Sequence, residues 1–296
     1  MKSSLSRGAA LTCAVTAAIA GHASGGAQAP PDRPLLFSGV RARNSDLYVL
    51  APSWQPAAAA SESAAAGTGA DSISLGDDLY VKRIGENLWL HVSSRELDGR
   101  PAWSNGVVVA GPRGAIVIDT PWEDEQTARL LDWIDGAIGA PVIGVVVTHF
   151  HDDRMGGIRT VHARGIPTYG SWLTARRAKR EGDPPPMHTF RDHVGLSTGA
   201  DSLDVFYPGP GHTRDNVAVW LPQRRVLVGG CMVRGTRTRS LGFTGEADLK
   251  RWPASLGRVR ERCGTAEVVI PGHGAIGGLD AIANTERLLR ERGEER

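Results

Sequence analysis

The sequence lacks three features, and each absence excludes a class of protein. No apolar run reaches the roughly 20 residues that a membrane-spanning helix requires, so membrane insertion is not expected. Cysteine occurs only 3 times in 296 residues, too rarely for a disulfide framework. The formal net charge is only +2, from 34 cations and 32 anions, which argues against a nucleic-acid partner. An ordinary globular protein remains, with 41% hydrophobic and 22% charged residues.

Residues 1–23 are typical of an export signal. A basic start is followed by a short apolar stretch and by small residues where a signal peptidase would cut, after Ala23 or as late as Ala27. We therefore expect a periplasmic protein from which the signal is removed. The loss of two cations with residues 1–23 would leave 32 cations and 32 anions, so the mature chain is formally neutral.

Composition divides the remaining chain into two parts. Residues 24–77 are rich in Ala, Pro, Ser and Gly, and such a segment buries too little apolar surface to offset its ordering entropy. We expect a largely disordered linker there. From 78 to 296, alternating and helical apolar patterns follow one another, which predicts one catalytic domain of sheets covered by helices, a layered α/β arrangement.

The periodicity also places the elements. Pairs of strands are predicted within 79–94 and 104–120, and single strands at 142–147, 166–171, 201–209, 216–222, 225–231 and 267–273. Helices are predicted at 123–139, 157–165, 173–182, 245–263 and 278–293. Between the first two strand pairs, the polar segment 93–103 has Asp98-Gly99 as its turn.

Residues that can bind a metal stand at the ends of four predicted strands. Three follow the strand 142–147 at a spacing of two, which in an extended chain directs them to one side: His149, His151 and Asp153. Three more stand beside glycines, which leave room for an ion: His212, Cys231 and His273. Six donors exceed the four of a structural zinc site and suit two ions with open positions. Imidazole and thiolate favour zinc over magnesium or calcium.

The motifs HFHDDR, GHTRDN, GGC and PGHG, in this order and spacing, resemble the zinc-dependent β-lactamases, in the subclass with one three-histidine site and one Asp-Cys-His site. The resemblance covers residues 79–296 and includes IDTPW at 118–122. It implies an αββα sandwich of two mixed sheets between helix layers, with the metals in a cleft at one edge. It also assigns the ligands: His149, His151 and His212 to a first zinc ion, and Asp153, Cys231 and His273 to a second.

The resemblance implies an activity as well, the hydrolysis of the β-lactam amide bond by a zinc-bound hydroxide that Asp153 orients. Such an enzyme would confer resistance to β-lactams, carbapenems included. We expect two zinc ions per chain, a small-molecule β-lactam substrate and a monomer. One alternative is a hydrolase of the same fold that acts on lactones, thioesters or sulfate esters. Cys231 and Arg154 argue against this alternative. The other alternative is a module that holds zinc without catalysing a reaction. The incomplete ligand sets, which leave open positions on the metal, argue against it.

Three residues are candidates for substrate binding. Arg234 lies where the family usually has a lysine that binds the substrate carboxylate, and one more solvated charge is the alternative. Phe243 lies where members often have an asparagine near the lactam carbonyl, and it cannot donate that hydrogen bond. Trp103 stands at the base of the polar hairpin 93–103, which in the resemblance closes over substrate; a place in the core is the alternative.

Three further residues are expected to support the metal loops rather than to react. Related hydrolases of the glyoxalase II and lactonase kind have a metal-binding histidine at the position of Arg154. Here the arginine is expected to form an ion pair with Asp152 or Asp153. Asp119 and Asn216 complete this group.

Overall fold

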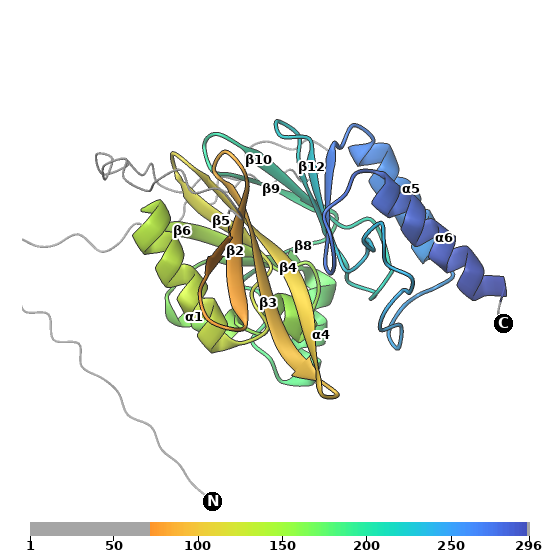
Figure 1. The fold of residues 1–296 in the computed structure, drawn as a ribbon, viewed down its shortest axis with the longest axis horizontal. Helices are drawn as coiled ribbons and strands as arrows, with labels where there is room; N and C mark the ends of the chain where they lie inside the picture. The colour runs from red at the N-terminus through yellow and green to blue at the C-terminus, as the bar shows by residue number, and fades with distance from the viewer. Residues whose placement is uncertain (1–71, 295–296) are drawn as a thin grey trace, which may run out of the picture. The chain divides into compact units, whose positions relative to one another are not determined.

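The computed structural model describes residues 72–294, so the predicted export signal and nearly all of the predicted linker lie outside the described residues. Within 72–294, two β-sheets pack face to face, and helices cover the outer face of each (Figure 1). The predicted αββα sandwich is confirmed. No helix in this range is long and apolar enough to cross a membrane.

The first sheet has eight strands in chain order, antiparallel from β1 to β5 and parallel from β5 to β8. They are β1 (Ser72–Ser74), β2 (Leu79–Gly85), β3 (Leu88–Leu97), β4 (Arg100–Gly111), β5 (Gly114–Ile118), β6 (Val142–Val146), β7 (Thr168–Ser171) and β8 (His188–Phe190). β1 falls within the segment 24–77 predicted as linker, so the sheet begins before residue 78.

The second sheet has five strands in the order β13-β12-β11-β10-β9, of which only β12 and β13 pair in parallel. They are β9 (His193–Ser197), β10 (Ser202–Phe206), β11 (Ala218–Leu221), β12 (Val226–Gly230) and β13 (Val268–Pro271). β8 and β9 were not predicted. Both are short, and β8 has no apolar alternation that would mark it as a strand.

The helices are α1 (Asp124–Trp133), its π-helical extension η1 (Ile134–Ile138), α2 (Asp152–Met155), α3 (Ile158–Ala163), α4 (Trp172–Glu181), α5 (Trp252–Cys263) and α6 (Asp280–Glu294). The predicted end at Gly139 is confirmed, because this residue has a left-handed φ of 69°. The predicted start of α5 at 245 was wrong. Pro253 lies in the first turn of the helix, where its missing N–H costs nothing, and the helix begins at Trp252.

Three apolar layers hold these elements together. Inward side chains of both sheets form the central layer, among them Val107, Ile118 and Val219, which are fully buried. α1 and α3 pack on the outer face of the first sheet, and α5 and α6 pack on the outer face of the second. The loops between the sheets therefore emerge at shared edges of the sandwich.

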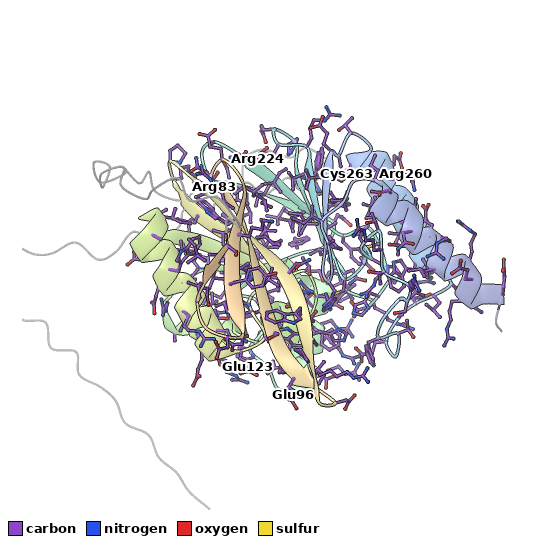
Figure 2. All side chains as sticks on the ribbon, in the orientation of Figure 1. Arg83, Glu96, Glu123, Arg224, Arg260 and Cys263 are labelled. Atoms are coloured by element: carbon purple, nitrogen blue, oxygen red, sulfur yellow. The ribbon has the colours of Figure 1, made fainter. Side chains whose placement is uncertain are left out.

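One hairpin extends beyond the rest of the first sheet. Residues 95–97 of β3 and 100–102 of β4 pair only with each other, whereas β2 pairs with β3 no further than Ser93. The turn between them consists of Asp98 and Gly99, with φ values of 51° and 72°. Two left-handed residues form the tight turn that joins twisted strands, for which Asp-Gly is a preferred sequence. Glu96 marks the tip of this hairpin (Figure 2).

Candidate metal centre

The six predicted donors come together at one edge of the sandwich, from loops that follow β6, β10, β12 and β13. The spacing of the first three donors predicted that they share one extended segment, and this prediction was wrong. The chain leaves β6 at Val146 and starts α2 at Asp152, so Asp153 lies in a helical turn. This change of direction lets Asp153 face the second group of donors while His149 and His151 face the first.

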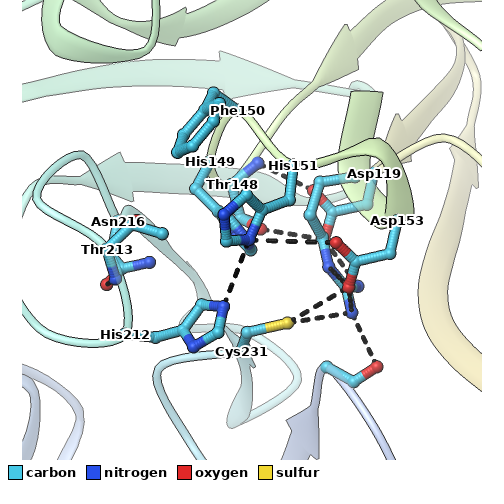
Figure 3. Close-up of polar contacts among 12 residues, drawn as sticks. Asp119, Thr148, His149, Phe150, His151, Asp153, His212, Thr213, Asn216 and Cys231 are labelled. Carbon is cyan, nitrogen blue, oxygen red and sulfur yellow. Dashed lines mark hydrogen bonds and ion pairs between the residues drawn. The ribbon is translucent and has the colours of Figure 1, made fainter. Parts of the chain in front are cut away.

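The first group consists of three imidazoles. His149 Nε2 lies 3.0 Å from His151 Nδ1, and His212 Nε2 lies 3.3 Å from the same atom (Figure 3). His149 and His212 are buried, and His151 is partly exposed. Three ring nitrogens that converge in this way offer three lone pairs to a single cation, which is the arrangement of a three-histidine metal site.

The second group is centred on Asp153. Its Oδ2 lies 3.0 Å from His273 Nε2 and 3.3 Å from Cys231 Sγ. Its Oδ1 lies 4.0 Å from His149 Nε2, so the two groups adjoin. A carboxylate, a thiol and an imidazole in contact form a donor set that suits zinc, and Asp153 is the link between the two sets.

Burial controls the protonation of the histidines. It lowers the pKa of His149 well below its usual value and that of His212 to about 3, so both are neutral at pH 7. Burial also acts to lower the pKa of His273, but Cys231 and Asp153 outweigh it and raise that pKa to about 9. Metal ligation needs neutral imidazoles. The first group has them, and in the second group Asp153 and Cys231 favour a positive charge at the position of His273, so the donors fit a metal such as zinc.

Arg154 lies behind the second group and is completely buried. Its Nη2 lies 2.8 Å from Asp153 Oδ2, 3.1 Å from Cys231 Sγ and 2.7 Å from the carbonyl oxygen of Gly272. Of its two predicted partners, Asp153 is in contact, whereas Asp152 pairs with Arg95 instead. Burial would raise the pKa of Asp153, but the guanidinium outweighs it and holds that pKa well below its usual range.

Asp119 and Asn216 each hold a loop that carries a histidine. Asp119 accepts hydrogen bonds from the backbone N–H and the hydroxyl of Thr148, at 2.7 and 3.0 Å, and so fixes the chain just before His149. It has a left-handed φ of 65°, and burial raises its pKa to about 6. Asn216 accepts from the N–H of Thr213, at 2.9 Å, directly after His212. Both therefore hold the backbone next to a predicted donor without belonging to the donor sets.

Two residues that the sequence did not indicate hold His151 in place. The Nε2 of His151 lies 3.0 Å from Glu246 Oε2, and it donates when Nδ1 faces the donor cluster. The other carboxylate oxygen of Glu246 pairs with Arg177 of α4, whose guanidinium lies 4.5 Å above the ring of Phe150. A carboxylate on the far nitrogen of a metal-binding histidine fixes the ring and increases its basicity.

Replacing Glu246 by alanine is expected to weaken metal binding by the three histidines by about 10- to 100-fold, because the ring of His151 loses its hydrogen-bond acceptor. Competition with a chromophoric chelator would measure the affinity. Glu267→Ala is the matched control, since Glu267 pairs with Arg225 on the surface and should leave the affinity unchanged. Equal affinities in both variants would contradict the positioning role.

Asn105 was also missed, although it breaks the apolar run of β4. Its Nδ2 donates to the carbonyl oxygens of Pro271 and Gly274, at 2.9 and 2.8 Å, and its own backbone N–H donates to Gly272, at 2.8 Å. These bonds tie the first sheet to the loop that carries His273. A buried amide whose N–H donors all have acceptors favours one arrangement of the two sheets.

Four of the six donors, His151, Asp153, His212 and His273, line a cleft of about 720 Å³. Arg234 lines it and is only 9% exposed, unlike its exposed neighbours Arg237 and Arg239, so it is not one more solvated charge. Phe243 also lines the cleft; it is 62% exposed, and its ring centroid lies 5.8 Å from that of His151. The cleft therefore combines a buried cation with an apolar ring beside the donors.

Trp103 contributes to the centre through its backbone. Its carbonyl oxygen lies 2.7 Å from His273 Nδ1, so it holds the side of that ring which faces away from Asp153. Its side chain is 39% exposed and packs against Tyr80, with ring centroids 5.9 Å apart. The indole thus lies neither in the core nor among the residues that line the cleft.

A family model, related sequences and solved structures all match this chain, and they agree on the family. Residues 101–273 match the metallo-beta-lactamase superfamily. The chain is 34% identical to the metallo-beta-lactamase type 2 of Bacillus cereus over 212 residues, 72% of this chain and 83% of that protein. It is 33% identical to that of Bacteroides fragilis over 224 residues, 74% of this chain and 89% of that protein.

Two solved structures resemble the described fold. The metallo-beta-lactamase from Pontibacter korlensis has a TM-score of 0.70 and 40% identity, and the match covers 72% of this chain and 99% of that one. The metallo-beta-lactamase FIM-1 from Pseudomonas aeruginosa, solved in a mono-zinc form, has a TM-score of 0.68 and 32% identity, with coverage of 74% and 99%.

Proposed function

The chain belongs to the metallo-β-lactamase superfamily, and from this premise we propose that it hydrolyses the amide bond of β-lactam antibiotics. The observation that carries the proposal is the pair of adjoining donor groups, four of whose six members line a cleft of about 720 Å³. Its thiol donor, Cys231, and the buried arginine behind it set this centre apart from the lactone and thioester hydrolases considered above.

We propose that two zinc ions bind, one to His149, His151 and His212 and the other to Asp153, Cys231 and His273. The donor types and their contacts support both sets, and the mono-zinc form of a structural relative makes the stoichiometry a quantity to be measured. Zinc held in this way acts as a Lewis acid and lowers the pKa of bound water to about 7.

Three residues of the chain have separate proposed roles toward the substrate. Asp153 is a carboxylate at neutral pH because Arg154 lowers its pKa, so it can accept a hydrogen bond from the attacking water and orient it. Arg234 offers a planar donor pair to the carboxylate that β-lactams carry. Phe243 supplies an apolar face, and it donates no hydrogen bond to the lactam carbonyl.

We further propose that carbapenems are among the substrates. The basis is that these groups act on the lactam carbonyl and the carboxylate, which carbapenems share with penicillins and cephalosporins. Export to the periplasm is supported by the composition of residues 1–23, and action as a monomer is proposed with it because each donor comes from one chain.

Steady-state hydrolysis tests the proposal. The mature protein should turn over a chromogenic cephalosporin and a carbapenem when loaded with zinc, and chelation should abolish both activities. A thioester and a lactone serve as contrasting substrates. Turnover of either of these, without turnover of any β-lactam by folded and zinc-loaded protein, would assign the centre to a different reaction.

Arg234→Ala is expected to raise KM for β-lactams by about 10- to 100-fold, because a hydrogen-bonded ion pair contributes roughly 1.5–3 kcal/mol. The value of kcat should change less, since the carboxylate is held equally in the ground and transition states. Arg237→Ala is the control, because Arg237 is an exposed arginine of the same loop. Similar KM values for both variants would show that Arg234 does not bind substrate.

A further inference from the structure

A second cavity, of about 510 Å³, adjoins the metal cleft. Phe150, Arg177 and Glu246 line both spaces and so form their common wall. The feature that distinguishes this cavity is its basic lining, which contains four arginines, three from α4 and one from the loop that carries His212: Arg176, Arg177, Arg180 and Arg214.

The two acidic residues of the lining are already engaged. Asp215 accepts hydrogen bonds from the backbone N–H of Phe150, at 3.0 Å, and from the hydroxyl of Thr174, at 2.8 Å. Glu246 is shared between His151 and Arg177. Within the part of the chain that the structure describes, neither carboxylate forms an ion pair with Arg176, Arg180 or Arg214.

Those arginines have no carboxylate partner within residues 72–294. Arg180 and Arg214 form no side-chain ion pair there, and Arg176 lies over the ring of Trp172, 5.1 Å from its centroid. Arg176 and Arg180 are also four residues apart on α4, where like charges repel each other. An anion between them would remove this repulsion.

We propose that this cavity is a binding site for a compact oxyanion, a carboxylate or a phosphate. Guanidinium groups present paired N–H donors that match the oxygens of either group, and α4 and the His212 loop bring them to one space from two sides. The anion has two sources: free phosphate, or a second carboxylate on a β-lactam bound in the adjacent cleft. The second source rests on the proposed function.

Calorimetric titration of the zinc-loaded protein with inorganic phosphate tests the site. Saturable binding is expected, at least about tenfold weaker in Arg180→Gln and in Arg214→Gln, because each substitution removes charge-assisted hydrogen bonds. Lys179→Gln is the matched control, an exposed cation of the same helix outside the cavity. Circular dichroism would verify that all three variants fold.

Phosphate bound at the metals instead would retain its affinity in the cavity variants, and this result would overturn the proposal, as would the absence of saturable binding. If Lys179→Gln lost as much phosphate affinity as the cavity variants, general surface charge would explain the binding, and the proposal would again be overturned. These measurements need no turnover, so they stand apart from the test of β-lactam hydrolysis.

Kinetics then identify the source. If the anion is part of the substrate, Arg180→Gln should raise KM about tenfold for a cephalosporin with two carboxylates and leave KM unchanged for one with a single carboxylate. If KM is unchanged for both while phosphate binding is lost, the site serves a free anion.

Discussion

Replacing Arg154 by alanine is expected to lower the free energy of unfolding by about 3–5 kcal/mol, the cost of removing one partner from a buried ion pair. The guanidinium has no exposure to solvent, and it forms ion pairs with both Asp153 and Asp119, with Nη1 3.2 Å from the carboxylate of Asp119. Without it two buried carboxylates lose their counter-charge, and the carbonyl oxygen of Gly272 loses its donor. Denaturant unfolding of metal-free protein, followed by circular dichroism, would measure the loss.

Arg159→Ala provides the control, because Arg159 forms an exposed ion pair with Asp183 that should contribute no more than about 1 kcal/mol. Arg154→Lys keeps the charge but loses the planar fork, so it should fold and show an intermediate loss. It keeps the test open if the alanine variant does not fold. A loss under about 1 kcal/mol for Arg154→Lys and for Arg154→Ala alike would mean that the arginine is dispensable.

The second large effect is expected from Cys231→Ser. The serine hydroxyl stays protonated at neutral pH and is a poor zinc ligand, so the variant should bind fewer zinc ions and lose about a hundredfold or more in kcat/KM. Metal analysis of dialysed protein and hydrolysis of a chromogenic cephalosporin would give the two values. Cobalt-substituted protein adds a direct readout, because its thiolate absorption should disappear.

Cys263→Ser is the matched comparison. Cys263 is the other buried cysteine of the described residues, and it lies on α5 in the apolar layer outside the second sheet (Figure 2). Its replacement should lower stability and leave zinc content and kcat/KM unchanged. Full zinc content and full activity in Cys231→Ser would contradict the assignment of the thiol as a ligand.

Local patterns predicted the layered α/β class and the six candidate donors, whereas the αββα sandwich and the division of the donors into two sets came from the family resemblance. Apolar alternation revealed β10, β11, β12 and β13, and the donors stand where such strands end. The carboxyl ends of β6, β12 and β13 meet at one edge of the sandwich, so residues more than a hundred positions apart, such as His149 and His273, become neighbours. Donor type and strand-end position were therefore enough to predict that these residues lie close together.

The supporting contacts were less predictable, because they join segments without local signals. Glu246 lies in a loop before α5, and only the packing of α4 brings Arg177 to it. The early start predicted for α5 placed Glu246 inside a helix, although Pro253 already indicated a later start. The turn of the chain into α2, which separates Asp153 from the two histidines before it, likewise has no signature in the spacing of the three donors.

The hairpin of β3 and β4 has a consequence for exchange of amide hydrogens with solvent. Beyond Ser93 the hairpin has two strands, and an isolated two-stranded ribbon is only marginally stable in water. Its tip can therefore open without disturbing the eight-stranded sheet, at a small free-energy cost. We expect the amides of Val107 and Val109, which are paired inside the sheet and fully buried, to exchange only when the whole domain unfolds. One continuous strand, β4, is thus expected to contain both weakly and strongly protected amides.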